Sequence, residues 1–319
     1  MSDLTFIFYS LKSRWLNCLL SILLTSFGVS IALLIIQFGN HIENRLIKDG
    51  EGIDIVVGAK GSPLQLILSS IYHIDIPTGN IPYSDVENLK KHPQIKTAIP
   101  LALGDNWKGH RIVGTTSEYL SHYNAEFAKG DIWKKEFEIV IGSSVKLNID
   151  DEIIGAHGLM DSGKLHDDHK YKVTGILKST GSVLDRLIIT SLNSVLEIHG
   201  LHKVNHEEKK NLKPDNQDHE HKEHNDHEHE EHNDHEDEEF SEESESNIPE
   251  ITALLITTNS PIANINLPRL INKNSSLQAA NPAIEMVRLT SMLGFGSKSF
   301  GILSYLLISI AALSIFSGL

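Results

Sequence analysis

The pattern of apolar and charged positions divides the chain into two apolar runs separated by a long mixed region. Residues 15–40 contain no Asp, Glu, Lys, Arg or His, and 17 of these 26 residues are hydrophobic. A helix needs about 20 such residues to cross the hydrocarbon core of a bilayer. We therefore predict a transmembrane helix over 15–40. Residues 299–319 are also uncharged, with 14 of 21 hydrophobic, and predict a second, incomplete transmembrane helix.

The flanks of the first apolar run indicate its orientation. Lys12 and Arg14 precede the run, so the positive-inside rule places residues 1–14 in the cytoplasm. Apolar residues at helical spacing within 1–14 predict an amphipathic helix at the membrane interface, or else the beginning of the same helix. A buried soluble helix and a cleaved signal peptide are the competing readings. The run exceeds the 7–15 residues of a signal-peptide core, and Gln37-Phe38-Gly39-Asn40 lacks a small-x-small cleavage site.

Between the two runs, residues 41–205 and 251–298 predict an extracytoplasmic α+β domain. Short segments rich in β-branched residues are bounded by Gly, Pro, Asn and Asp, as is typical of strands. Few helices separate these strands, and this mixture favours an α+β module over an all-β or a parallel α/β one. The predicted strands are 53–57, 95–103, 110–115, 138–141, 171–177, 187–190 and 251–257.

Local signals predict two helices and one turn in this domain. Ser84-Asp85-Val86-Glu87 matches a capping box, and Pro93 follows the expected end of that helix. Asn281-Pro282 predicts a helix N-terminus, and a stripe of Met286, Leu289 and Leu293 leads from it towards the second transmembrane run. Gly104-Asp105-Asn106 predicts a turn between two strands.

Composition changes this picture at one place, residues 206–250. The formal net charge of the chain is −14, but this segment alone holds 19 Asp and Glu against 4 Lys. The rest of the chain is close to neutral. A segment with so few apolar residues has no means of burying a core, so we expect 206–250 to be a disordered insert. The acidic balance argues against nucleic acid as a partner.

The same insert carries the strongest candidate for metal binding. Neutral imidazoles and carboxylates suit Zn²⁺ or another divalent metal, although the spacing here lacks the closed tetrahedral pattern of structural zinc sites. The alternative is a solvated spacer with no metal function. The candidate ligands are His219, His221, His224, His227, His229, His232 and His235. Cys18 is the one cysteine, which excludes an intrachain disulfide and any cluster of cysteine ligands.

Other polar motifs give no catalytic constellation. Gly58-Ala59-Lys60-Gly61-Ser62 follows a predicted strand, but its lysine precedes the second glycine, so a Gly-rich turn is favoured over a phosphate-binding loop. His166-Asp167-Asp168-His169 is read as a polar loop, and Asp185-Arg186 as an ion pair or loop anchor. No nucleophile, base and orienting group occur together. We therefore do not expect this chain to be an enzyme.

Taken in order, the predicted elements resemble a known family. The segment Ser10-Leu11-Lys12-Ser13-Arg14, which leads into the first span, resembles the start of ABC transporter permeases of the MacB/FtsX-like type, which include macrolide exporters and lipoprotein-releasing permeases. Residues 138–143, 172–177 and 180–186 resemble the periplasmic core domain of that family, and 54–65 resembles one branch of it. The resemblance covers the whole chain except the acidic insert.

This resemblance implies a permease subunit of the bacterial inner membrane. Such permeases usually have four spans and form a homodimer or a permease pair in membrane lipid. A separate cytoplasmic ABC ATPase subunit hydrolyses ATP, and its closure is transmitted through the first helix to the outer domain, which drives substrate export or extraction. The sequence departs from the pattern by its histidine tract and by stopping within the second span, so we expect further spans after Leu319. The alternative function is a membrane-anchored metal-binding or sensor protein without an ATPase partner.

Overall fold

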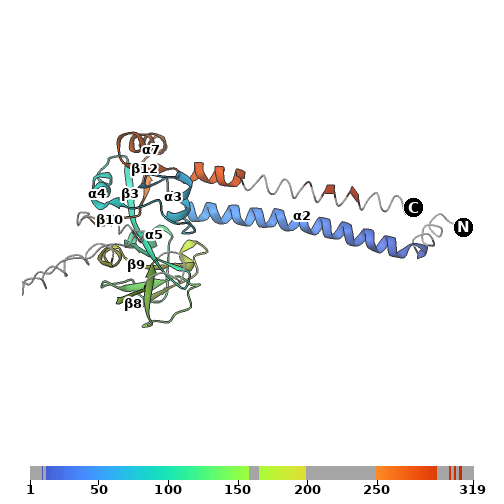
Figure 1. Ribbon diagram of the computed structural model, residues 1–319, viewed down its shortest axis with the longest axis horizontal. Coiled ribbons are helices and arrows are strands. Elements are labelled where there is room, and N and C mark those ends of the chain that lie inside the picture. Colours follow the sequence, from blue (N-terminus) through green and yellow to red (C-terminus); the bar gives the residue numbers. More distant parts are fainter. Residues whose placement is uncertain are drawn as a thin grey trace, which may run out of the picture.

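The computed structural model describes residues 9, 12–157, 165–198 and 249–292, and five isolated positions between 302 and 310. One long helix, α2 (Trp15–Gly50), extends away from a mixed α+β domain (Figure 1). Residues 206–248 of the predicted acidic insert, with its seven candidate histidine ligands, lie outside the described residues. So do most of residues 1–14 and most of the predicted span 299–319. The predicted end of the insert is wrong, because Glu250 belongs to a strand, β10 (Glu250–Ile251).

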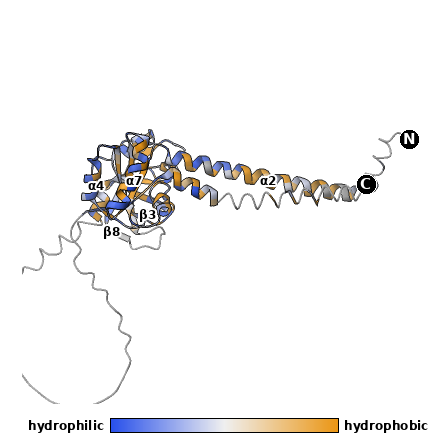
Figure 2. Cartoon of the chain, turned by 90° about the horizontal axis from the view of Figure 1, so that it is seen from above, coloured by the Kyte–Doolittle hydropathy of each residue, from blue (hydrophilic) through white to orange (hydrophobic). Residues whose placement is uncertain are grey.

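Helix α2 contains the whole first apolar run and continues past it to Gly50. Among the described residues, its part Ile22–Gly50 is the one helix that is long and apolar enough to cross a membrane, by length and composition. Figure 2 shows hydrophobic positions along this helix where it reaches out from the domain. Large side chains such as Leu23, Phe27 and Leu34 are more than half exposed. A core helix of a soluble protein would bury such side chains, so their exposure disfavours the soluble alternative.

The domain is built on one mixed sheet. Ten strands belong to it, in the order β12-β1-β11-β3-β4-β9-β6-β8-β5, and β7 pairs with both β3 and β8. Most pairs are antiparallel, whereas β4 with β9 and β6 with β8 are parallel. The strands are β1 (Ile55–Ala59), β3 (Ile95–Trp107), β4 (His110–Thr115), β5 (Phe127–Gly130), β6 (Glu138–Ile141), β7 (Glu152–His157), β8 (Leu165–Leu177), β9 (Ile188–Ser191), β11 (Ala253–Thr258) and β12 (Leu277–Ala280).

Short helices and a small second sheet complete the domain. The strand pair β2 (Ile81–Pro82) and β10 (Glu250–Ile251) stands apart from the main sheet. The helices are α3 (Pro63–Ser70), α4 (Tyr83–Lys90), α5 (Ser117–His122), α6 (Leu192–Leu196) and α7 (Pro261–Asn274), with a 3₁₀ turn η1 (Val183–Arg186) and a further helix over 282–292. Three clusters of buried apolar side chains fill the domain, and the largest includes Leu46 from α2 and Met286 from 282–292.

The α+β prediction is confirmed, and most predicted strands match observed ones. Residues 138–141 coincide with β6, and 110–115 coincide with β4. The helix predicted after Asn281 is present, and the Asn281 side chain accepts hydrogen bonds from the backbone N–H groups of Ala283 and Ile284. The turn predicted over Gly58–Ser62 is shorter than expected, because Gly58 and Ala59 belong to β1 and the chain bends only at Lys60 and Gly61. The Ser62 side chain then caps α3 by accepting from Gln65 N.

Three other local predictions are wrong. Gly104-Asp105-Asn106 is no turn, because β3 continues to Trp107 through an irregularity in its pairing with β4 and also pairs with β7. The turn lies at Lys108 and Gly109, which both have positive φ, as a tight two-residue hairpin requires. The capping box fails because Pro82 precedes the first helical residue and the N–H of Tyr83 bonds to Pro249 O at 2.8 Å.

The third wrong prediction is the polar loop over residues 166–169. They belong to strand β8, which pairs antiparallel with β7. Backbone groups make the hydrogen bonds between strands. A run of polar residues can therefore form a strand where the sheet does not pack against a core on both of its faces. Hydrophobic alternation therefore shows only the buried part of β8, from Tyr171 onwards.

Candidate functional site at the base of the long helix

The last turns of α2 form a dense hydrogen-bonded junction with the domain. Three charged side chains near its end, Arg45, Lys48 and Asp49, all bond to the loop over residues 179–186. Arg45 donates to Ser182 O and Lys48 to Thr180 O, each at 2.9 Å. These residues come directly after the apolar run, where the chain becomes polar again. The helix is therefore bonded to the domain at the point where the apolar part gives way to charge.

Asp49 is the centre of this junction. It is 2% exposed, and one carboxylate oxygen accepts from the backbone N–H of Val183 at 2.7 Å. Its other oxygen lies 3.6 Å from Arg45, one helical turn earlier. A buried carboxylate needs such partners, because a charge left without them pays a large desolvation cost. The contacts of Asp49 therefore hold α2 in one rotation about its own axis relative to the loop.

Two tyrosine hydroxyls bond to carbonyls at the end of α2. Tyr72 donates to Leu46 O at 3.0 Å, and Tyr123 donates to Asp49 O at 2.8 Å. The last carbonyls of a helix have no partner within the helix, so such donors stabilise its end. Burial raises the pKa of both tyrosines above the usual value, so both hydroxyls keep the proton that they donate. The junction thus involves α3 and α5 regions as well as the loop.

The loop over 179–186 is itself held by one carboxylate. Asp185 accepts from the backbone N–H groups of Thr180 and Gly181, at 2.7 and 2.9 Å, and from the hydroxyls of Ser179 and Thr180. Gly181 has φ of +64°, a conformation that favours glycine. The loop-anchor reading of Asp185 from the sequence is confirmed. Arg186 does not pair with it but donates to the carbonyl of Tyr72.

This arrangement predicts an acid-sensitive junction. Burial alone would raise the pKa of the Asp185 carboxyl, but the hydrogen bonds from Thr180, Ser179 and Gly181 outweigh burial and hold the pKa below its ordinary value of 3.8. The stabilisation is therefore complete above 3.8 and is lost as the pH falls through the lower folded-state pKa. We expect Asp185→Asn to lower the urea midpoint of unfolding at neutral pH. The gap between the midpoints of wild type and variant should shrink as the pH falls further below 3.8.

Urea unfolding followed by tryptophan fluorescence measures both effects. Glu136 provides the control, since Glu136→Gln removes a solvent-exposed carboxylate from a residue outside the loop. A gap between the midpoints of wild type and Asp185→Asn that does not shrink at any pH below 3.8 would contradict the role of the ionised carboxylate.

A second helix packs beside the end of α2. In the two views, the helix over 282–292 runs next to the domain end of α2 (Figures 1 and 2). Met286 and Leu289 join the apolar cluster that also contains Leu46 and Ile42. The predicted stripe on this helix is confirmed for Met286 and Leu289, whereas Leu293 lies outside the described residues. The helix that precedes the domain, α2, and the helix that follows it, over 282–292, thus lie side by side at the junction.

The sequence did not identify this junction as a site. Arg45, Asp49, Tyr72 and Tyr123 match no motif, and their partners lie up to 137 residues away along the chain. The available signal was the cluster of charges after the apolar run together with Asp185. The structure tests none of the seven predicted histidine ligands, and the described part of the chain holds no other group of three or more His, Cys, Asp or Glu that could bind a metal.

A comparison with known proteins assigns this fold. The family model described as the MacB-like periplasmic core domain matches residues 18–211, which is well over half of the chain. The chain belongs to the MacB/FtsX-like ABC transporter permeases. The family resemblance seen in the sequence is confirmed. A permease of this family is an inner-membrane protein with an extracytoplasmic segment, it works with an ABC ATPase partner, and its own subunit is not the enzyme.

Solved structures with low sequence identity resemble the permease. The crystal structure of the periplasmic region of MacB from Actinobacillus actinomycetemcomitans aligns with a TM-score of 0.41 and 12% identity, over 76% of this chain and 97% of that chain. The extracellular domain of the noncanonic ABC-type transporter YknZ from Gram-positive bacteria aligns with a TM-score of 0.38 and 12% identity, over 71% and 99%. No curated protein gives a significant sequence match to this chain.

Proposed function

We propose that the chain is the permease subunit of an ABC-type transporter and that α2 transmits force to the extracytoplasmic domain. In this proposal α2 crosses the inner membrane once, with its N-terminus in the cytoplasm and the sheet domain outside. A separate ATPase subunit binds the cytoplasmic side of a homodimer or permease pair in membrane lipid. Its ATP-driven closure moves α2, and the domain follows, which exports or extracts the substrate.

The observation that supports this proposal is the junction. A helix transmits a displacement only if its end is fixed in the domain that has to move. The end of α2 is fixed by a buried carboxylate, Asp49, by two cationic side chains and by two tyrosine hydroxyls. A helix that merely anchored an independent domain would need none of these contacts, since a flexible linker is sufficient.

Co-purification with an ATPase tests the proposal. The full-length permease, tagged and extracted in mild detergent from its own host, should retain a soluble subunit that carries a Walker A loop and hydrolyses ATP. Asp49→Ala should retain the same subunit, because the junction lies far from the cytoplasmic end of α2. A preparation that contains no ATPase under conditions that preserve the dimer would support the anchored alternative instead.

The histidine tract supports a second, separate proposal. We propose that His219, His221, His224, His227, His229, His232 and His235 together capture Zn²⁺ or another divalent metal, because imidazole and carboxylate groups alternate through this segment. This binding would be weak and multiple, without a role in catalysis, and would link the permease to metal homeostasis.

Isothermal titration of the full chain with ZnCl₂ tests the metal proposal. We expect several binding events in the micromolar range that disappear when residues 218–235 are deleted. A matched variant in which the seven histidines become glutamine keeps every carboxylate of the tract and should also lose these events. A titration that neither variant changes would contradict the proposal, and it would leave the permease function untouched.

A further inference from the structure

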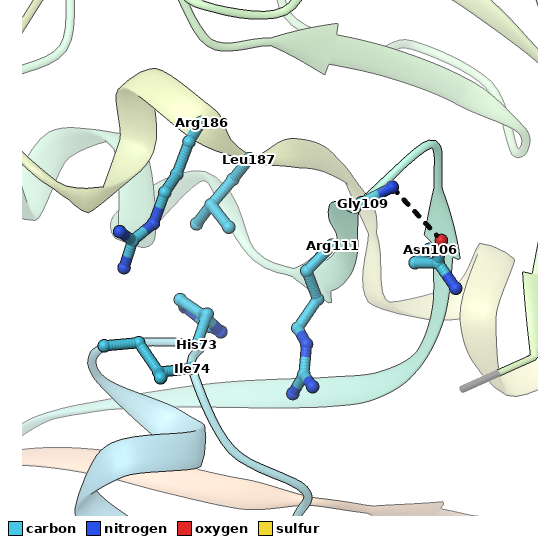
Figure 3. Close-up of a pocket in the computed structure, with 7 residues that line it drawn as sticks. All are labelled: His73, Ile74, Asn106, Gly109, Arg111, Arg186 and Leu187. Carbon is cyan, nitrogen blue, oxygen red and sulfur yellow. Dashed lines mark hydrogen bonds between the residues drawn. The ribbon is translucent and has the colours of Figure 1, made fainter. Parts of the chain in front are cut away.

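A small cavity beside the junction has no role in the proposed force transmission. Its volume is about 220 Å³, and it lies between the segment after α3 and the tip of the β3–β4 hairpin. The lining residues are His73, Ile74, Asn106, Gly109, Arg111, Arg186 and Leu187. In Figure 3 the side chains of Arg186 and Arg111 lie on either side of His73. Three nitrogen-rich side chains from different parts of the chain therefore surround one space.

Arg111 carries a buried donor without a partner. Arg111 is 7% exposed, and one of its terminal nitrogens donates to Asp75 O at 3.1 Å. The other terminal nitrogen is buried and makes no hydrogen bond. Burial lowers the pKa of Arg111 from its usual value, with the charge of Asp75 acting in the opposite direction. A guanidinium stays protonated in proteins, so this donor remains a positive charge.

His73 adds a second buried nitrogen without a partner. The residue is 8% exposed, and its Nε2 lies 3.0 Å from the hydroxyl of Tyr119. Its Nδ1 is buried without a hydrogen bond. Burial, and then the positive charges of Arg111 and Arg186, lower the pKa of His73 well below the usual value. The imidazole is therefore neutral and can present an N–H to the cavity in one tautomer.

The nearby carboxylates, Asp75 and Asp49, lie outside the lining of this cavity. The charge of the Asp75 carboxylate acts on Arg111, but Asp75 is not among the residues that line the cavity. Asp75 uses one carboxylate oxygen to accept from the N–H of Ile76 at 2.7 Å. The charge of Arg186 also acts on the Asp49 carboxyl. That carboxyl, however, already accepts a hydrogen bond from Val183 and pairs with Arg45. Two positive charges thus face one small space whose lining contains no carboxylate.

Unpartnered buried donors of this kind are costly unless a ligand satisfies them. Guanidinium groups match the geometry of an oxyanion, to which they donate two parallel hydrogen bonds. We propose that this cavity binds a phosphate-type oxyanion, held by Arg111 and Arg186 with an N–H of His73. The lining holds no carboxylate that would repel such a group.

The rim of the cavity distinguishes two sources of this group. Ile74, which lines the cavity, is 59% exposed, and Ile76, two residues further along the chain, is 61% exposed. An amphiphile with a phosphate headgroup would cover these apolar side chains, whereas free phosphate would not touch them. The two arginines would therefore bind the phosphate group of either ligand. Only the amphiphile would also contact the isoleucines, so their substitution distinguishes the two ligands.

Titration of the full-length permease in phosphatidylcholine nanodiscs tests the site. The probes are inorganic phosphate and dihexanoyl phosphatidic acid below its critical micelle concentration. We expect one saturable site that Arg111→Gln and Arg186→Gln each weaken about tenfold or more, because each loses a charge-assisted hydrogen bond. Arg111→Lys keeps the positive charge but loses the two parallel N–H donors of the guanidinium. It should therefore weaken binding less than Arg111→Gln does, while preserving the fold.

The matched control is Arg269→Gln, on the exposed face of α7, which should bind both probes as wild type does. If phosphatidic acid binds tighter than phosphate and Ile74→Ser removes this advantage, the site takes a lipid headgroup. Equal binding of both probes assigns free phosphate. Absence of saturable binding by either probe, or an equal loss in Arg269→Gln, overturns the proposal. Unfolding curves of each variant show that the fold is retained.

Discussion

Replacing Asp49 with alanine is expected to lower the free energy of unfolding of the permease by about 2–3 kcal/mol. The substitution leaves the buried N–H of Val183 without an acceptor and leaves Arg45 without its ion pair. It also removes the contact that sets the rotation of α2 against the loop over 179–186. Urea unfolding gives the free energy, and hydrogen exchange at Val183 should accelerate markedly in the variant.

The control for this prediction lies two residues further along the chain. Glu51 is exposed, so Glu51→Ala removes one solvent-exposed carboxylate at nearly the same place. It should change neither the free energy of unfolding nor the exchange at Val183. If Asp49→Ala behaves as Glu51→Ala does, the carboxylate is not what joins the helix to the domain.

Gly142→Ala is expected to destabilise the permease by about 3 kcal/mol. A Cβ atom at this position would lie 2.0 Å from Leu184 O and 2.5 Å from the carbonyl group of Asp185. These are backbone atoms of the loop that holds α2, and the loop is not free to retreat. Gly142 N bonds to Leu187 O at 2.9 Å, and Ser144 N bonds to Asp185 O at 2.7 Å.

Thermal unfolding of Gly142→Ala and Ser143→Ala measures this effect. Ser143 is the next residue and is exposed, so its alanine variant should unfold as wild type does. Hydrogen exchange should also rise across 180–186 in Gly142→Ala, because the added methyl group displaces that loop. A stable Gly142→Ala variant with an unchanged loop would show that the close contact does not exist in solution.

The elements that the sequence predicted correctly are those with a local signal. Strand β6 and strand β4 have dense apolar runs between turn residues, and both were predicted at their observed bounds. The polar half of β8 and the buried Asp105 within β3 carry no such signal. Their strand conformation comes from pairing with β7, which lies far from β3 in the sequence. Pairing with another strand overrides local preference in both places, although β7 is distant from β3 and is the strand directly before β8.

The candidate site illustrates the same limit. Asp185 could be predicted because its donors, Thr180 and Gly181, lie within five residues of it. Asp49 could not, because its partner Val183 is 134 residues away. Arg111 and His73 likewise meet only after the hairpin and the segment behind α3 fold together. A pattern along the chain shows which groups are chemically able to form a site, whereas the fold decides which of them meet.

The topology of α2 supports every step of the proposed function, and cysteine labelling measures it most directly. Cys18→Ser removes the one native thiol, after which K12C and K108C each add a single exposed one. We predict that a membrane-impermeant maleimide labels the K108C variant in intact spheroplasts and labels the K12C variant only in inverted vesicles. Labelling of the K108C variant only in inverted vesicles would place the sheet domain in the cytoplasm and contradict the account.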